Sequence, residues 1–336
     1  MDRLLDTLPF LAAPFVACLV IASLHCYMGL HVIKRGVIFV DLALAQAAAL
    51  GAAVALAMAP VVCSESHLHH ADTRTPLVTE AHLAAQLNLE EDTPTAEAVS
   101  DKESVVSRAH DHAAHEHEHA YLGYGMSLFF ALLAALLLSF GRLRDERIPH
   151  EAVIGIIFVV CAALSVLILS KAPHGHEKME AMLVGSILFV SWQQVVAMLL
   201  LYLILGVFHF VVRRHFLEIS QNVASAERTG KRVRLWDCLF YGSFALMVTQ
   251  SVSIAGVFVV FSYLIIPGAC ASLFADSFRA QLVAAWAVAA GTTVFGLAFS
   301  ALADMPTGSS LVSCFGAVLV LSAIAGAFIR KRGDRT

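Results

Sequence analysis

VIFVDLALAQAAALG, residues 37 to 51, has the composition of a membrane helix, yet it carries a carboxylate at Asp41 and an amide at Gln46. The alanines around Gln46 and the glycine at position 51 are small residues of the kind that let membrane helices pack closely. Ionisable side chains within a span are costly, and by default they face the bundle interior or a watery path. The stretch therefore predicts an interior transmembrane helix whose polar residues have a role.

Each polar residue of this stretch also has a purely structural explanation. Asp41 could pair with Lys34 or Arg35, or it could bond a neighbouring helix. Gln46 could form an interhelical hydrogen bond. From the residues alone, these explanations stand beside a place on a transport path.

The whole chain has the composition of a polytopic membrane protein. Of its 336 residues, 59% are apolar and only 14% are charged, and the mean hydropathy is +0.76. Soluble domains are about a quarter charged. Because a span needs about 20 apolar residues, we predict an all-α bundle with spans at 8–30, 36–60, 121–140, 152–170, 182–212, 281–302 and 309–329. The segment 237–275, broken at Thr249-Gln250-Ser251, adds a hairpin of two.

The basic residues predict the orientation of the bundle. They collect in short segments that should face the cytoplasm, at 34–35, 142–147, 213–236, Arg279 and 330–335. The N-terminus, the 61–120 loop and the 171–180 loop then face outward. This arrangement needs nine crossings in one permease domain over 1–336, with eight spans and a re-entrant hairpin as the alternative. A basic surplus confined to such loops predicts no nucleic-acid partner.

The loop from 61 to 120 is acidic and rich in histidine. Its twelve acids and three bases give a local charge of −9, and its composition favours disorder. Alternating imidazole and carboxylate, as in HDHAAHEHEH (110–119), predicts weak metal-collecting sites, although an acidic linker without a specific role is the alternative. The candidate outer metal ligands are His67, His69, His70, His110, His112, His115, His117, His119, His174 and His176.

Four further segments, taken with 31–51, resemble the membrane permeases of ABC importers for zinc and manganese. HVIKRGVIFVDLALAQAAALG is similar to their GDALAHAALPG segment. Three later blocks of that family are resembled, in the same order, by EAVIGIIFVVCAALSVLILS (151–170), LVGSILFVSWQQV (183–195) and VSIAGVFVVFSYLIIPGACASLFADS (252–277). FLEISQNVASAERTG (216–230) is similar to the cytoplasmic loop that follows the middle spans of that family. The resemblance covers most of the chain outside 61–120 and implies a type II ABC importer fold.

The family pattern departs from this sequence at the metal gate. In the family the gate is Asp-x3-His on one helix, and alignment on the following glycine places Gln46 at the histidine and Leu42 at the aspartate. Asp41 is one position off, and about 140° around the helix from Gln46. The resemblance therefore implies metal ligands at Asp41 and Gln46 that act on different faces, with His25 and His31 as possible additional ligands.

The resemblance also implies an assembly. Pro267 and Gly268 would end a span, and a short coupling helix over 268–280 would dock on the ATPase through Pro267, Gly268, Ala269, Ala271 and Ser272. The chain has no GxxxxGK[ST] loop, so ATP would be bound by a separate ATPase subunit. We expect a homodimer, or a pair with a similar chain, in the lipid bilayer of the inner (plasma) membrane. An extracytoplasmic metal-binding protein would dock outside.

We thus predict that the chain is a permease and not an enzyme. Its substrate would be zinc, manganese or a chelated metal, which it would carry by alternating access, and it would need no cofactor. A secondary zinc carrier is one alternative, because RIPHEAVIGI (147–156) resembles the HExPHE helix of the ZIP transporters. The HNxxDG partner helix of that family is absent, and Glu151 suits a helix N-terminus. A metal sensor that transports nothing is the other alternative.

Overall fold

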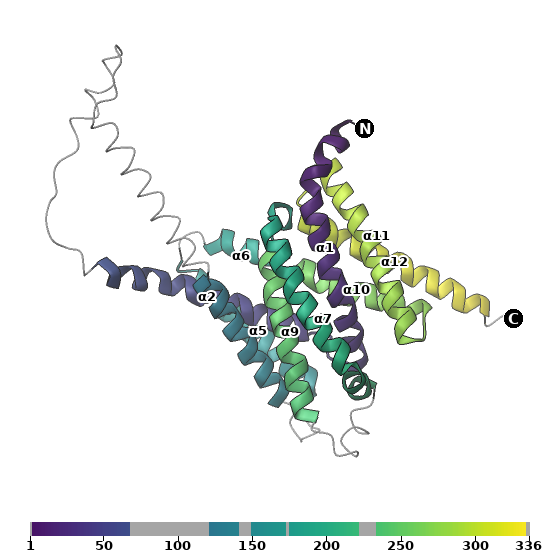
Figure 1. Cartoon of the computed structure of the whole chain (residues 1–336), viewed down its shortest axis with the longest axis horizontal. Helices are drawn as coiled ribbons and strands as arrows, with labels where there is room; N and C mark the ends of the chain where they lie inside the picture. Colours follow the sequence, from purple (N-terminus) through teal and green to yellow (C-terminus); the bar gives the residue numbers. More distant parts are fainter. Residues whose placement is uncertain (1, 68–120, 141–148, 173–174, 222–232, 334–336) are drawn as a thin grey trace, which may run out of the picture.

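The chain forms a helical bundle in the computed structural model, which describes residues 2–67, 121–140, 149–172, 175–221 and 233–333 (Figure 1). Nine helices in the described part are long and apolar enough to cross a membrane, which agrees with the nine crossings expected. The elements are α1 (Asp2–Arg35), α2 (Val40–His67), a helix over Tyr121–Phe140, α5 (His150–Leu169), α6 (Gly175–Val184), η1 (Ile187–Phe189), α7 (Trp192–Gln221), α9 (Val233–Ala255), α10 (Val257–Phe274), α11 (Phe278–Ala303) and α12 (Thr307–Gly333).

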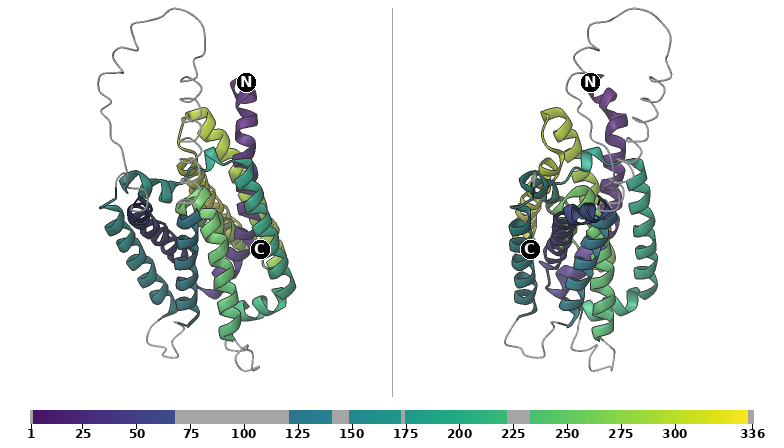
Figure 2. Two further views of the ribbon diagram at one scale, coloured as in Figure 1. Left: turned by 60° about the vertical axis from the view of Figure 1, so that its left-hand side comes forward. Right: turned by 90° about the vertical axis from the view of Figure 1, so that its left-hand side faces the viewer.

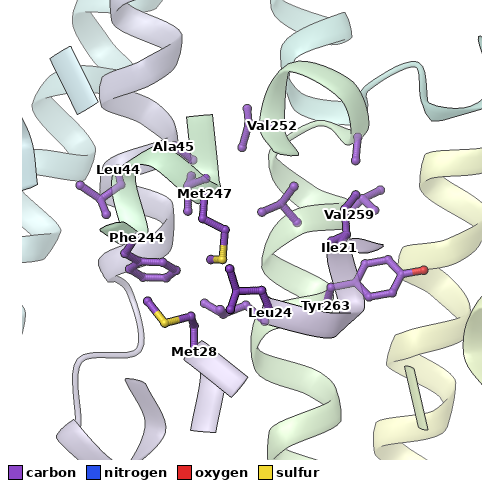
Figure 3. Close-up of a cluster of buried hydrophobic side chains, with 14 of the residues drawn as sticks. Ile21, Leu24, Met28, Leu44, Ala45, Phe244, Met247, Val252, Val259 and Tyr263 are labelled. Carbon is purple, nitrogen blue, oxygen red and sulfur yellow. The ribbon is translucent and has the colours of Figure 1, made fainter. Parts of the chain in front are cut away.

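Helices α1, α2, α9 and α10 form the interior of the bundle. Helix α1 packs against α7, α10 and α11, whereas α2 packs against α5 and α9. Figure 3 shows the side chains that meet between them, from Ile21, Leu24 and Met28 of α1, Leu44 and Ala45 of α2, Phe244, Met247 and Val252 of α9, and Val259 and Tyr263 of α10. The outer helices α5, α7 and α12 instead expose long apolar faces, as helices in contact with lipid do.

The break between α9 and α10 lies at Gly256, so the predicted break at Thr249-Gln250-Ser251 is wrong. The Ser251 hydroxyl donates a hydrogen bond to the carbonyl of Met247 at 2.9 Å, so this polar side chain is accommodated within the helix. Gly256 has φ +79°, a left-handed conformation that glycine adopts without a steric cost. The backbone conformation of one glycine, rather than side-chain polarity, ends α9.

Three chain segments meet backbone to backbone at the predicted outer end of the bundle. A Cβ on Gly185 would lie 2.2 Å from the carbonyl oxygen of Ala255, and a Cβ on Gly256 would lie 2.4 Å from the nitrogen of Gly185. A Cβ on Gly308, at the start of α12, would lie 2.3 Å from the oxygen of Val184. These three glycines form what we call the glycine junction, which joins the α6–η1 link, the α9–α10 break and α12.

Helix α10 continues through Pro267 to Phe274, and α11 begins at Phe278. The prediction that Pro267 and Gly268 end a span, and that a separate short helix covers 268–280, is therefore wrong. Proline removes the backbone hydrogen bond to the carbonyl four residues earlier, here that of Tyr263. The Cys26 thiol of α1 donates to this carbonyl at 3.9 Å, and such contacts from neighbouring helices are what let membrane helices tolerate proline.

The fifth span also differs from its predicted bounds of 182–212. Helix α7 starts at Trp192, after α6 and η1, and it extends to Gln221, so the expected cytoplasmic loop over 213–236 is helical at both ends. The last turns of α7 pack on α9, with the ring of His215 stacked on Trp236 at 4.4 Å between centroids. Figure 2 shows α7 and α9 side by side, with their joined ends at the opposite side of the bundle from the N-terminus.

Candidate functional site

Asp41 is a buried carboxylate at the start of α2. Its residue is 1% exposed, and neither carboxylate oxygen has a hydrogen-bond partner among the described residues. A buried polar group without a partner costs free energy, and a charged one costs far more. Within a membrane bundle, a group of this kind is a functional candidate by default.

Both predicted ion-pair partners of Asp41 are engaged elsewhere. The Lys34 ammonium lies over the ring of Phe278, 5.3 Å from its centroid. Arg35 forms an ion pair with Asp237 of α9 at 2.8 Å, and both side chains are only 3% exposed. The same guanidinium donates through Nε to Ser220 Oγ at 2.9 Å and lies 3.9 Å above the ring of Phe240. Neither Lys34 nor Arg35 pairs with Asp41, and no described residue of a neighbouring helix forms a hydrogen bond with its carboxylate.

Gln46 lies on a different face of α2 and lines a cavity of about 460 Å³. Leu42 and Ala49, one turn before and about one turn after it, line the same cavity, whereas Asp41 does not. The remaining walls come from α5, α6 and α10 and are almost entirely apolar, and they include Met179 and Met182. The two polar residues of α2 thus face separate surroundings, as their spacing on the helix requires.

His25 is fully buried on α1 among hydrogen-bonding groups of the bundle. Its Nδ1 lies 3.0 Å from the carbonyl of Ile21 and 3.3 Å from the Tyr202 hydroxyl, and its Nε2 lies 3.3 Å from the hydroxyl of Ser251. Both ring nitrogens therefore have partners from within the protein. His25, which the sequence suggested as an additional metal ligand, instead links α1, α7 and α9 through hydrogen bonds.

A second group of buried polar atoms lies nearer the predicted cytoplasmic end. It contains His31, which the sequence had suggested as a ligand, together with Tyr27 and His209, which it had not. His31 Nδ1 is 2.9 Å from Ser220 Oγ, and His209 Nε2 is 2.9 Å from Ser243 Oγ. The other nitrogens of both rings, and the hydroxyl of Tyr27, are buried and have no partner among the described residues. His209 sits in an apolar run of α7, and only its isolation in that run could have drawn attention to it.

Two of the predicted outer histidines lie in the described part of the chain. His67 is the last residue of α2, and His176 is exposed on α6. The described residues contain no group of three or more His, Cys, Asp or Glu side chains that could hold a metal ion. The other eight outer candidates lie outside the described residues. They are His69, His70, His110, His112, His115, His117, His119 and His174.

The predicted coupling residues are mostly inaccessible. Pro267, Gly268 and Ala271 are buried within α10, Ala269 is half-buried, and only Ser272 is exposed. Beyond it, Leu273 and Phe274 are 40% and 51% exposed at the end of the helix. A partner at this turn could therefore contact residues 272–274, and not the earlier part of the segment.

Nine apolar helices in the described part of the chain define a multi-pass membrane protein, and its buried carboxylate, amide and histidines are polar groups of the kind that mark functional sites in membrane interiors. The sequence profile of the ABC 3 transport family matches residues 121–326, so the chain belongs to this family. It is a permease subunit of the inner membrane and not an enzyme.

Curated relatives are similar to this chain in sequence, and a solved structure is similar to it in fold. The chain is 27% identical over 191 residues to the chelated iron transport system membrane protein YfeC of Yersinia pestis, over 56% of this chain and 64% of YfeC. It is 25% identical over 218 residues to the manganese transport system membrane protein MntC of Listeria innocua, over 62% of this chain and 75% of MntC. The fold resembles a chain of PsaBC from Streptococcus pneumoniae with a TM-score of 0.65 and 17% identity, covering 95% of this chain and 93% of that one.

Proposed function

We propose that this chain is the membrane subunit of an ATP-driven importer of divalent metal ions. The family match supports a permease, and the relatives named above serve manganese and chelated iron. The observation that carries the proposal for this chain itself is the buried carboxylate of Asp41, which has no partner among the described residues. A carboxylate kept in a membrane interior without a structural partner is suited to meet a cation that passes through it.

The metal carried is part of the proposal, because the chain combines two kinds of donor. Oxygen donors, such as Asp41 and the Gln46 amide, suit manganese, whereas imidazole suits zinc. The outer histidines favour zinc collection, and they would raise its concentration near the permease. We expect zinc and manganese both to be imported, with the outer histidines affecting zinc alone.

The partners follow from the same proposal. ATP hydrolysis would occur on a separate ATPase subunit at the cytoplasmic face, where Ser272, Leu273 and Phe274 are exposed at the α10–α11 turn. A metal-binding protein would deliver the ion at the outer face, and two copies of this chain would form the membrane unit. Closure of the ATPase subunits would then drive alternating access.

Metal uptake tests the proposal directly. The chain is co-expressed with its ATPase and binding-protein subunits in a bacterium whose own zinc and manganese importers have been deleted. The uptake of radioactive zinc and of radioactive manganese is then measured. We expect Asp41→Asn to reduce uptake at least tenfold and Gln46→Ala to reduce it less. Asp304→Asn and Gln193→Ala are matched controls, because both residues are exposed. Normal uptake by both Asp41 and Gln46 variants would refute a role for them on the metal path.

Deletion of residues 64–119 tests the role of the outer histidines. We expect the deletion to reduce zinc uptake when zinc is scarce and to leave it unchanged when zinc is ample. An equal effect at both concentrations would contradict the collecting role, and the permease function would stand.

The contact made by Glu151 bears on the alternative of a secondary zinc carrier. Its carboxylate accepts a hydrogen bond from the backbone N–H of Ile38 at 3.2 Å, just before α2 begins. His150, its neighbour, lies 3.4 Å from the Tyr241 hydroxyl. These contacts give the HE pair a structural role at helix ends. Uptake into vesicles that contain this chain without its ATPase would nevertheless favour the secondary carrier.

A further inference from the structure

A cavity of about 770 Å³ lies between α1, α7 and the start of α11, and it shares no residue with the cavity at Gln46. This volume is within the usual range for ligand sites in proteins. We call it the α1–α7–α11 groove. It is lined by Ser23, Leu24, Tyr27, Tyr202, Gly206, His209, Phe210, Arg213, Leu217, Ser277, Phe278, Arg279, Leu282 and Trp286.

The inner wall of the groove carries polar atoms that lack partners. His209 is 2% exposed, and its Nδ1 has no hydrogen-bond partner among the described residues, although its Nε2 is bonded to Ser243. The Tyr27 hydroxyl is also buried without a described partner, and the two rings meet edge to face at 5.6 Å between centroids. Both atoms are buried beneath the groove surface, so the surface that a ligand meets at this wall is mainly apolar.

The mouth of the groove is basic. Arg213, near the end of α7, and Arg279, at the start of α11, are both exposed and have no ion-pair partner within the described part of the chain. The guanidinium of Arg213 is 4.1 Å from the ring centroid of Phe210. No lining residue is acidic. By the positive-inside rule this mouth is at the cytoplasmic surface of the membrane, where anionic lipid head groups attract basic side chains.

The groove continues away from its basic mouth along an apolar surface. A second hollow of about 390 Å³ follows α7 and shares Ser23, Tyr202, Gly206 and Phe210 with the first. From Arg213 to Leu199 at its far end, α7 rises about 21 Å, more than half of a hydrocarbon core about 30 Å thick. Leu203, on the wall of this hollow, is 61% exposed. The length and the apolar wall match one acyl chain of one leaflet.

We propose that the α1–α7–α11 groove binds an anionic phospholipid of the cytoplasmic leaflet. The head-group phosphate contacts Arg213 and Arg279, and one acyl chain lies along α7 towards Leu199. A basic mouth at one end and an apolar channel at the other match the two ends of such a lipid. A second copy of this chain fits less well, because the groove offers two cations and no lining acid for a self-complementary contact.

Lipid binding to the full-length purified protein tests this proposal without any measurement of transport. Native mass spectrometry in detergent follows titrations with phosphatidylglycerol, phosphatidylcholine and inorganic phosphate. We expect retention of phosphatidylglycerol above the other two probes. Each arginine near a phosphate contributes enough to change affinity roughly fivefold, so Arg213→Gln with Arg279→Gln should weaken binding about 25-fold. The control Arg214→Gln, an exposed neighbour that does not line the groove, should bind as the unaltered protein does.

A steric variant separates this groove from general attraction to basic residues. A Cβ on Gly206 would meet no atom within 4 Å, so Gly206→Leu should fold normally and fill the groove. We expect it to lose phosphatidylglycerol binding, whereas Gly155→Leu, at an equally open glycine of α5, should retain it. Thermal melting and size-exclusion chromatography check that both variants are folded.

Four results would overturn the proposal. Phosphatidylcholine binding equal to that of phosphatidylglycerol would remove the role of charge. Displacement of the lipid by inorganic phosphate at the same concentration would indicate a site for free anions. Undiminished binding by folded Gly206→Leu would place the lipid elsewhere. A disulfide between two copies of Leu203→Cys in membranes would show that a second copy of the chain occupies the groove.

Discussion

Removal of the carboxylate of Asp237 should destabilise the protein strongly, because it leaves a buried cation. The Arg35 side chain is 3% exposed and loses its 2.8 Å ion pair. Breaking a buried pair by removing one partner costs about 3–5 kcal/mol. The guanidinium keeps the Ser220 hydroxyl at 2.9 Å and the ring of Phe240 at 3.9 Å, so for Asp237→Ala we expect a value near the lower limit, about 3 kcal/mol.

A double-mutant cycle isolates the contribution of the pair. Arg35→Met combined with Asp237→Leu removes both charges at once, a replacement that is often nearly neutral for buried pairs. We therefore expect the double variant to cost at least about 2 kcal/mol less than the sum of the two single variants, within the range of coupling energies for residues in contact. Reversible unfolding by SDS in mixed micelles, followed by tryptophan fluorescence, measures each value, and Trp236 beside Asp237 is a local reporter.

An exposed cation on the same helix is the control for this cycle. Arg234 is exposed one turn before Asp237, so Arg234→Met should change stability by less than about 0.5 kcal/mol. If the effects of Arg35→Met and Asp237→Leu simply add, the ion pair does not couple α1 to α9, and the reasoning from its burial is refuted.

Three further predictions concern close contacts and the buried carboxylate. Gly29→Ala places a Cβ 1.9 Å from the carbonyl oxygen of Leu264 and should lower the free energy of unfolding in SDS by about 3 kcal/mol or more. The control Gly206→Ala has open space at its Cβ and should change that free energy by less than about 0.5 kcal/mol. Gly256→Ala combines φ +79° with a backbone clash at 2.4 Å and should cost more than about 2 kcal/mol, with a Tm lowered to match. Asp41→Leu removes an unpartnered buried carboxylate, so it should raise stability by about 1 kcal/mol while it abolishes metal uptake; lower stability would show that the carboxylate has a structural partner.

Hydropathy was sufficient to predict the class of fold, because the membrane demands long apolar segments whose backbone bonds are satisfied within each helix. It was insufficient for the helix ends. Ser251 looked like a break, but its hydroxyl bonds within the helix, whereas Gly256 ends α9 through its left-handed backbone. Pro267 looked like a stop, but the Cys26 thiol takes up the carbonyl that proline leaves free. Both errors arose because side-chain composition does not report backbone conformation or contacts from other helices.

The candidate site shows more clearly that a sequence does not reveal contacts between distant helices. The sequence singled out Asp41 and Gln46 as polar residues in a span and placed them on different faces, which follows from helical spacing alone. It could not identify the partner of Arg35, because Asp237 is 202 residues away along the chain. Hydropathy records which segments enter the membrane and contains nothing about which of them meet.

The contacts that join the helices differ between the two ends of the bundle, and this difference bears on how it could move. Near the predicted cytoplasmic end, Arg35 joins α1 to α7 and α9 through side-chain hydrogen bonds, which flexible side chains can exchange as helices shift. At the glycine junction the backbones themselves are in contact, with no room for even one methyl group. Packed backbones resist sliding because the smallest displacement causes overlap. We therefore expect α9 to move about the glycine junction as a pivot, so that cross-linking the predicted cytoplasmic ends of α1 and α9 should block transport while cross-linking across the junction should not.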